Sequence, residues 1–338
     1  MGKENTILSE IPGRCTDLRK RALDMKYIET FREGDRITDV YLCKSRLHAI
    51  AKNGKAYENV SLMDKTGSIN AKIWDPESSG IGDFDELDFV NVTGDVVMFQ
   101  NSPQLNIKRI RIASEDEYIP GDYVPATEKD VDVMYEQLMQ ILSGVSNTWL
   151  QQLIKKYFED PEFQKAFKKH SAAKTVHHSF SGGLLEHTLS VVIMCNHYAD
   201  LYPYLKRDLL ITAAAFHDVG KLKELSDFPQ NDYTDSGQLL GHIMMGCELV
   251  GYGCRSIKGF PKKLAVELQH CILAHHGELE FGSPKKPAIP EALALNLADN
   301  ADAKLESMRE LIKSAGNNNG WLGYNKLFES NIRKSSEL

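Results

Sequence analysis

Histidine and aspartate side chains recur in apolar segments of the second half of the chain. His217 and Asp218 are adjacent in "AAFHDVGKLKE", and seven of the eleven histidines lie between residues 187 and 276. The histidines and aspartates that share this setting are His187, His217, Asp218, His242, His275, His276 and Asp299. Imidazole nitrogens and carboxylate oxygens suit divalent metals, whereas the lack of clustered cysteines argues against a structural zinc site. The pattern predicts a metal centre assembled from separate helices.

The adjacent pair of His217 and Asp218 sets a geometric condition. Neighbouring residues on a helix point about 100° apart, so both side chains reach one metal only at a helix end, which Gly220 favours. Because a carboxylate has two oxygens, Asp218 could bridge two metals while His217 binds one. Such a pair would activate a water and hold the oxygens of a phosphate ester. Lys221, one turn beyond His217, is placed to meet the phosphate or leaving group.

Each of these residues also has a structural interpretation when it is taken alone. His242 could be a buried histidine with a protein partner, the "LADNADAK" segment around Asp299 a solvated helix, and His276 a surface residue. We assign this interpretation to His197 and His270. For the remaining set it is disfavoured, because several polar groups on apolar faces are costly to bury without a common partner.

The elements that must position these residues differ between the two halves of the chain. Residues 36–112 contain short segments rich in Val, Ile and aromatic residues, with partial alternation of polarity and intervening turn signals, which is typical of strands. The segments are "ITDVYLCKSRLHAIA", "AYENVSLMD", "SINAKIWD", "FVNVTGDVVMF" and "QLNIKRIRIA". Strands that follow one another without a helix predict a small antiparallel β-barrel.

Helical spacing of apolar residues begins at residue 131 and continues to about 314, which predicts an all-α bundle. The expected helices span residues 131–145, 148–158, 161–170, 184–202, 208–219, 239–253, 262–276 and 289–314. The acidic, Pro-containing residues 114–130 are expected to link the two domains, and Thr127 with Asp130 resembles a helix-start box. Residues 1–26 form an amino-terminal extension and residues 315–338 a loosely structured tail.

Composition limits the class of protein. Hydrophobic residues make up 42% and charged residues 26% of the 338 residues, which is typical of a soluble globular protein. The apolar run "LLITAAAF" is far shorter than the roughly 20 residues of a membrane helix, so no membrane partner is expected. The charged amino terminus argues against export, and the six cysteines read as reduced thiols, so we expect a cytoplasmic protein. A net charge of −7 means that nucleic-acid binding would have to be local.

The order of His187, His217 with Asp218, and Asp299 on successive helices resembles the HD-domain superfamily of metal-dependent phosphohydrolases. "HHSFSGGLLEHTLSVV" and "AAFHDVGKLKEL", preceded by a barrel containing "KNGKAYENVSLMDKTGSINAKIWD", are similar to the YhaM-type 3′-5′ exoribonucleases. That family joins an OB-fold, here residues 27–113, to an HD domain, here residues 131–314. The resemblance extends from about residue 27 to residue 312.

The resemblance implies a set of metal ligands. His187, His217, Asp218 and Asp299 would hold a first metal, and His242 and His275 match the histidines that hold a second one in binuclear members. Whether His275 or His276 binds stays open, and Asp302 is a weaker candidate for the last carboxylate. The family implies Mn²⁺, as one or two ions; ligand chemistry alone equally allows Mg²⁺, Fe²⁺, Co²⁺ or Ni²⁺.

The OB-fold implies a surface for a single strand, bound through a basic groove and stacking aromatic residues. From Lys44 to Lys72 there are six basic and two acidic residues, which is equally explained by a solvated face. The candidates in the barrel are Lys52, Lys55, Tyr57, Lys65, Lys72, Trp74, Phe99 and Lys108; beside "HHSF" they are Lys174 and His178. Strand alternation favours core packing for Trp74 and Phe99, and a structural role is the alternative for His178.

These features together predict a 3′-5′ exoribonuclease that degrades single-stranded RNA, with single-stranded DNA as a further substrate. Activated water would attack the terminal phosphodiester and release nucleoside monophosphates. One alternative is a phosphohydrolase of small or cyclic nucleotides, in which the barrel is regulatory. Another is a DNA-binding accessory protein with a vestigial metal site, which the full ligand set disfavours. The sequence leaves open whether the chain forms a homo-oligomer.

Overall fold

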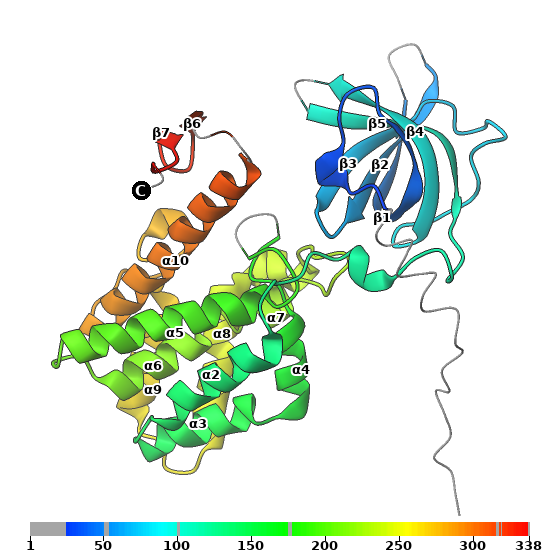
Figure 1. Ribbon diagram of the computed structural model, residues 1–338. Helices are drawn as coiled ribbons and strands as arrows, with labels where there is room; N and C mark the ends of the chain where they lie inside the picture. The colour runs from blue at the N-terminus through cyan, green and yellow to red at the C-terminus, as the bar shows by residue number, and fades with distance from the viewer. Residues whose placement is uncertain are drawn as a thin grey trace, which may run out of the picture. The chain divides into compact units, whose positions relative to one another are not determined.

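The chain divides into two compact units in a computed structural model that describes residues 25–50, 54–99, 102–174, 178–315, 318 and 320–336 (Figure 1). The first unit extends to Ala126 and includes residues 228–230, and the second contains the remainder from Thr127 onward. None of the helices in these described ranges is long and apolar enough to cross a membrane.

The first unit is a closed barrel in the strand order β1-β2-β3-β5-β4. Its strands are β1 (Arg36–Ile50), β2 (Ala56–Asp64), β3 (Gly67–Ile73), β4 (Phe89–Phe99) and β5 (Ser102–Ile112). Neighbouring strands pair antiparallel except β3 and β5, which pair parallel over Asn70–Lys72 and Gln104–Asn106. This is the five-stranded Greek-key barrel of the OB-fold, and the expected fold of this half is confirmed.

Alternation of side chains fills the barrel interior. On β3, Ile69, Ala71 and Ile73 are buried, whereas the residues between them face outward. This is the period of two expected for a strand with one face on a core. The phase of this alternation decides which aromatic residues remain available on the surface.

Residues 114–126, expected to link the domains, pack on the barrel. The ring of Tyr118 stacks on Phe89 of β4 with 3.9 Å between centroids, and Tyr123 is buried beside Leu42 and Met63. The short 3₁₀ helix η2 (Pro120–Asp122) lies between the two tyrosines. The segment is acidic in composition, but its aromatic residues gain burial on the barrel wall.

The second unit is helical. Its helices are α2 (Val131–Ser143), α3 (Thr148–Phe158), α4 (Pro161–Lys169), α5 (Gly183–Leu201), α6 (Arg207–Phe216), α7 (Lys221–Glu224), α8 (Asp235–Ser256), α9 (Lys262–Leu273) and α10 (Pro290–Ser314). Helix α5 packs against α2, α6 and α10, and α9 packs against α6 and α8 (Figure 1). One hydrophobic core spans α2, α3, α5, α6, α8, α9 and α10, so the expected helical bundle is confirmed.

Two local expectations in this unit need correction. Asp130, not Thr127, caps α2: its side chain accepts hydrogen bonds from the backbone of Asp132 and Val133. Thr127 instead donates to the buried carboxylate of Glu186 on α5. The tail contains a hairpin of β6 (Trp321–Asn325) and β7 (Ser330–Arg333), whose short strands lack the apolar alternation that would have predicted them.

Gly220 permits a close approach between the turn before α7 and helix α8. A Cβ atom at Gly220 would lie 1.9 Å from the carbonyl oxygen of His242 and 2.7 Å from the backbone nitrogen of Gly246. Because both neighbours are backbone atoms, a side chain at residue 220 would force the two segments apart. The close contact therefore fixes the position of His242 relative to Asp218.

Substitution of Gly220 tests this packing. Gly220→Ala should destabilise the helical unit by at least about 2 kcal/mol, because overpacking moves backbone rather than a flexible side chain. The matched control is Gly246→Ala on the facing helix, where a Cβ would make ordinary contacts of 3.4 Å or more. That control should be neutral or stabilising by up to about 1 kcal/mol through helix propensity. Urea unfolding followed by far-UV circular dichroism measures both; equal effects would contradict the packing argument.

Candidate metal centre

His217 and Asp218 lie in the turn that follows α6, which ends at Phe216, and precedes α7, which begins at Lys221. Both side chains are buried, with exposures of 0% and 2%. The two side chains face the same space, and His217 Nε2 lies 3.4 Å from Asp218 Oδ2. The helix-end placement expected for this pair therefore provides the required geometry.

One oxygen of Asp218 faces a first group of ligands. His187 on α5 directs Nε2 to within 3.4 Å of Asp218 Oδ2 and 3.2 Å of Asp299 Oδ1 on α10. The Nε2 atoms of His187 and His217 are 3.1 Å apart. Helices α5 and α10 and the turn after α6 thus bring two imidazoles and two carboxylates together.

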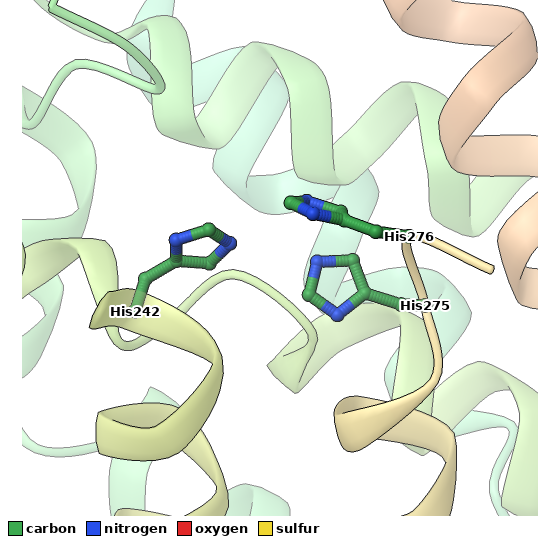
Figure 2. A group of neighbouring side chains, drawn as sticks. All are labelled: His242, His275 and His276. Carbon is green, nitrogen blue, oxygen red and sulfur yellow. The ribbon is translucent and has the colours of Figure 1, made fainter. Parts of the chain in front are cut away.

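The other oxygen of Asp218 faces a second group. His242 on α8 and His275, just after α9, place their Nε2 atoms 3.5 Å and 3.6 Å from Asp218 Oδ1. The ring of His276 lies 4.3 Å from that of His275 and 5.2 Å from that of His242. Figure 2 shows the three rings turned toward one another, with ligand atoms within 4.8 Å. His276 therefore lies beside this group, and whether His275 or His276 would bind an ion stays a prediction.

Hydrogen bonds at Nδ1 fix the tautomer of four histidines. His217 and His275 lie with Nδ1 2.8 Å and 2.7 Å from the carbonyl oxygens of Ala214 and Ile272. A carbonyl only accepts, so Nδ1 carries the proton and Nε2 presents a lone pair to the centre. Carboxylates have the same effect on the other two histidines, Asp302 on His187 at 2.7 Å and Glu224 on His242 at 3.0 Å.

These lone pairs suit a metal ion. Asp218 Oδ1, His242 Nε2 and His275 Nε2 are buried and have no hydrogen-bond partner among the residues that the structure describes. Burying such groups without a partner costs free energy, and a divalent cation would satisfy all three. The mixed nitrogen and oxygen set, shared through one carboxylate, fits one or two divalent ions.

The charge of the cluster supports the same interpretation. Burial raises the pKa of Asp218, but the charge of Lys221 and the neighbouring imidazoles of His217 and His187 outweigh it and hold that pKa well below its ordinary value. Burial lowers the pKa of His187, but hydrogen bonds with the surrounding carboxylates outweigh it and raise that pKa. Burial lowers the pKa of His275, which keeps its imidazole neutral. The centre attracts positive charge and retains a free lone pair.

The sequence that carries this centre matches known proteins. Residues 184–304 match the HD domain. The 3′-5′ exoribonuclease YhaM of Bacillus subtilis (strain 168) is 34% identical over 276 residues, which cover 81% of this chain and 87% of that protein. The protein of the same name in Bacillus velezensis is 35% identical over 280 residues, with the same coverage. The chain belongs to the YhaM family.

A solved structure resembles the barrel of this YhaM-family chain. It is the second OB-fold domain of replication protein A from Methanococcus maripaludis. The match covers 27% of this chain and 95% of the solved domain, with 19% identity and a TM-score of 0.21. The OB-fold assignment rests on the strand order of the barrel.

Two carboxylates lie behind the metal centre. Asp302, a weaker candidate for a metal ligand, contacts Nδ1 of His187, the nitrogen that faces away from the first group. Glu224 at the end of α7 accepts hydrogen bonds from both Nδ1 and the backbone nitrogen of His242. Sequence reasoning missed Glu224, whose only signal was its place one turn after Lys221. Carboxylates in this position orient histidine ligands and raise their basicity.

Lys221 forms an ion pair with Asp218. Its Nζ atom lies 2.6 Å from Asp218 Oδ2, and its side chain is 15% exposed. Burial lowers the pKa of Lys221, but Asp218 outweighs it and raises that pKa, so the side chain remains an ammonium. An ammonium has three donors, which leaves capacity for a phosphate oxygen. The role of Lys221 at the phosphate stays a prediction.

An aromatic face covers part of β2 and β3, and we define it as Tyr57, Lys72, Trp74 and Asn106. The rings of Tyr57 and Trp74 stack with 5.4 Å between centroids, and Lys72 Nζ lies 4.7 Å from the centre of the Tyr57 ring. Trp74 Nε1 donates to Asn106 Oδ1. This combination of stacking rings and a cation is the type of surface that binds single strands.

The expected core packing of Trp74 and Phe99 is wrong. They are 53% and 57% exposed, respectively. Ile73 takes the inward position at the end of β3, so Trp74 must point outward. Phe99 is the last residue of β4, beyond the closed part of the barrel interior.

The remaining candidates for nucleic-acid contact differ in their surroundings. Lys65 pairs with Asp122, Lys108 with Asp95 and Lys174 with Asp232. Lys55 is exposed beside β2, and Lys52 lies outside the described residues. Their contact with a strand stays a prediction.

His178 does not lie on the surface. It is 1% exposed, and its Nε2 atom contacts Asp302 at 3.1 Å. The ring therefore lies behind the metal centre, and this conformation offers no phosphate contact. The structural alternative for His178 is the one that the structure supports.

Removal of single ligands should separate the two groups. His242→Ala should lose the second ion and keep the first, whereas Asp218→Ala should lose both, because only Asp218 faces both groups. Inductively coupled plasma mass spectrometry after equilibration with Mn²⁺ measures the bound metal per chain. The matched control is His197→Ala, an exposed histidine on α5, which should bind as much metal as the wild type. Equal loss in His242→Ala and Asp218→Ala would contradict a shared carboxylate.

Proposed function

We propose that this protein is a metal-dependent exoribonuclease that removes nucleotides from the 3′ end of single-stranded RNA and releases nucleoside monophosphates. The observation that carries the proposal is the buried carboxylate of Asp218, with two histidines at each oxygen. The YhaM relatives are named 3′-5′ exoribonucleases, and the direction of degradation is extended from them to this chain. Mn²⁺ is the metal that we propose.

The residues of the centre have separate tasks in this proposal. One or two bound divalent ions would lower the pKa of a water and neutralise charge on the phosphate oxygens. His187, His217 and Asp299 would hold an ion at Oδ2 of Asp218, and His242 and His275 would hold one at Oδ1. Lys221 keeps Asp218 oriented through one N–H and offers another to the phosphate or the leaving group.

The barrel holds the strand in this proposal. The stacked rings of Tyr57 and Trp74 provide a surface for bases without regard to sequence, and Lys72 adds a positive charge near the phosphate backbone. The exposed Phe99 at the end of β4 offers a further ring. Single-stranded DNA shares the bases and phosphates that these groups contact, so we propose it as a second ligand.

Digestion of a labelled strand tests the proposed reaction. A single-stranded RNA labelled at its 5′ end should shorten progressively from the 3′ end when Mn²⁺ is present, with nucleoside monophosphates as products. Joint substitution of His217→Ala and Asp218→Ala should abolish cleavage and leave strand binding largely in place. Matched reactions contain single-stranded DNA, cyclic nucleotides or nucleoside phosphates. RNA that stays intact at both ends, or a double variant that still degrades it, would sink the proposal.

Substitution in the aromatic face tests the role of the barrel. Trp74→Ala should weaken RNA binding by about 1–3 kcal/mol, the usual value of one stacked base. The loss should raise KM and leave kcat nearly unchanged, because Trp74 belongs to the barrel unit and the candidate metal ligands belong to the helical unit. The matched control is Trp321→Ala in β6, where the indole is 67% exposed. Initial rates across an RNA concentration series measure both variants, and an unchanged KM for Trp74→Ala would exclude this face as the binding surface.

A further inference from the structure

Asp302 connects two histidines from different segments. It lies on α10, one turn after Asp299, and its Oδ2 atom is 2.7 Å from His187 Nδ1 and 3.1 Å from His178 Nε2. His187 belongs to α5, and His178 to the segment that precedes it. One carboxylate oxygen is therefore shared by two imidazole rings.

The backbone at His178 is strained. Its φ angle is 57°, in the left-handed region, which residues other than glycine adopt uncommonly and histidine, asparagine and aspartate adopt more often than the rest. Such a conformation persists only where the surroundings impose it. The contacts around His178 must therefore stabilise this backbone conformation.

Two contacts impose the conformation. The carbonyl oxygen of His178 accepts a hydrogen bond of 3.0 Å from the backbone nitrogen of Ala172. A Cβ atom at Gly183, the first residue of α5, would lie only 2.1 Å from the same oxygen. The absence of a side chain at residue 183 lets the His178 backbone press against the start of α5. The ring is thereby directed into the interior, at Asp302.

The two nitrogens of His187 separate a metal-binding side from a supporting side. Nε2 faces His217, Asp218 and Asp299, whereas Nδ1 faces Asp302. A metal held by Asp302 and His178 would need Nδ1 of His187 as well, and that nitrogen would then have to give up the proton that it donates to Asp302. The arrangement instead matches a carboxylate that accepts the Nδ1 proton of a metal-binding histidine.

We propose that His178 and Asp302 are a positioning pair that fixes the tautomer and direction of His187 for metal binding. Asp302 accepts the Nδ1 proton of His187, so Nε2 keeps its lone pair toward the centre. His178 donates to the same oxygen and holds the carboxylate in place. Neither residue touches the substrate. The inference rests on the proposed metal-dependent function. It adds His178, in the segment before α5, to the residues that position the metal ligands.

Manganese affinity of the full-length protein tests the pair without any nuclease assay. Titration of Mn²⁺, followed by electron paramagnetic resonance of the free ion, measures the dissociation constant. Asp302→Ala should weaken binding by about 10–100-fold, the usual effect of removing such a carboxylate. Asp302→Asn keeps the shape and an accepting oxygen but loses the charge, so its affinity should fall between those of Asp302→Ala and the wild type. This variant keeps the test decisive if Asp302→Ala fails to fold.

The variants of His178 separate positioning from general packing. His178→Ala should weaken manganese binding, and His178→Gln should restore most of it, because the glutamine amide can donate to Asp302 from nearly the same place as Nε2. Asn300→Ala, an exposed position on the same helix, is the matched control and should bind as the wild type does. Equal losses in His178→Ala and His178→Gln would overturn the positioning role.

Three further results would overturn the proposal. Wild-type affinity in Asp302→Ala and Asp302→Asn would show that His187 needs no partner. An additional manganese ion that is lost only when His178 or Asp302 is changed would make the pair metal ligands. A wild-type protein that binds no manganese would overturn the metal-dependent function together with this inference, whereas the other results leave that function standing.

Discussion

The buried carboxylate of Asp218 sets the requirements for the rest of the helical unit. A charge at 2% exposure is costly unless other groups compensate it, and here each oxygen faces two histidines while Lys221 contacts one of them. Those partners come from five places along the chain, so the helices must converge at this point. The bundle can be understood as the arrangement that supplies partners to one carboxylate.

Convergence of this kind needs backbones that approach closely. Histidine and aspartate side chains are short, and metal bonds to their atoms span only about 2.0–2.2 Å. Glycine meets the need at two points: Gly220 lets the turn after α6 touch α8, and Gly183 lets the start of α5 touch the backbone of His178. In both cases the residue that benefits is a histidine on or behind the centre. The glycines therefore act through geometry that no ligand pattern reveals.

The sequence predicted a feature where a residue type is costly to bury or recurs with a regular period. It did not predict a feature that depends on which residues become neighbours after folding. The barrel and the bundle could be predicted because apolar residues recur with different periods in the two halves of the chain. The candidate metal ligands could be predicted because polar side chains stand in apolar segments. In the sequence, Glu224 resembles an ordinary surface glutamate, and only the folded structure shows its contact with Nδ1 of His242. Trp74 was assigned to the wrong face of the strand. Alternation shows that neighbouring side chains point to opposite faces, but it does not show which face is buried until a neighbour such as Ile73 is known to point inward. His178 could not be placed, since its position depends on a strained backbone.

Charge separates the two tasks of the protein. The centre gathers the carboxylates of Asp218, Asp299, Asp302 and Glu224, all with a pKa below its ordinary value. A phosphodiester is also negative, so these groups repel it unless divalent cations neutralise them. The aromatic face has no such requirement, because stacking on Trp74 and its neighbour needs no metal. In the proposed function, the barrel would therefore hold a strand without metal, whereas the terminal phosphate would enter only a centre whose negative charge has been balanced.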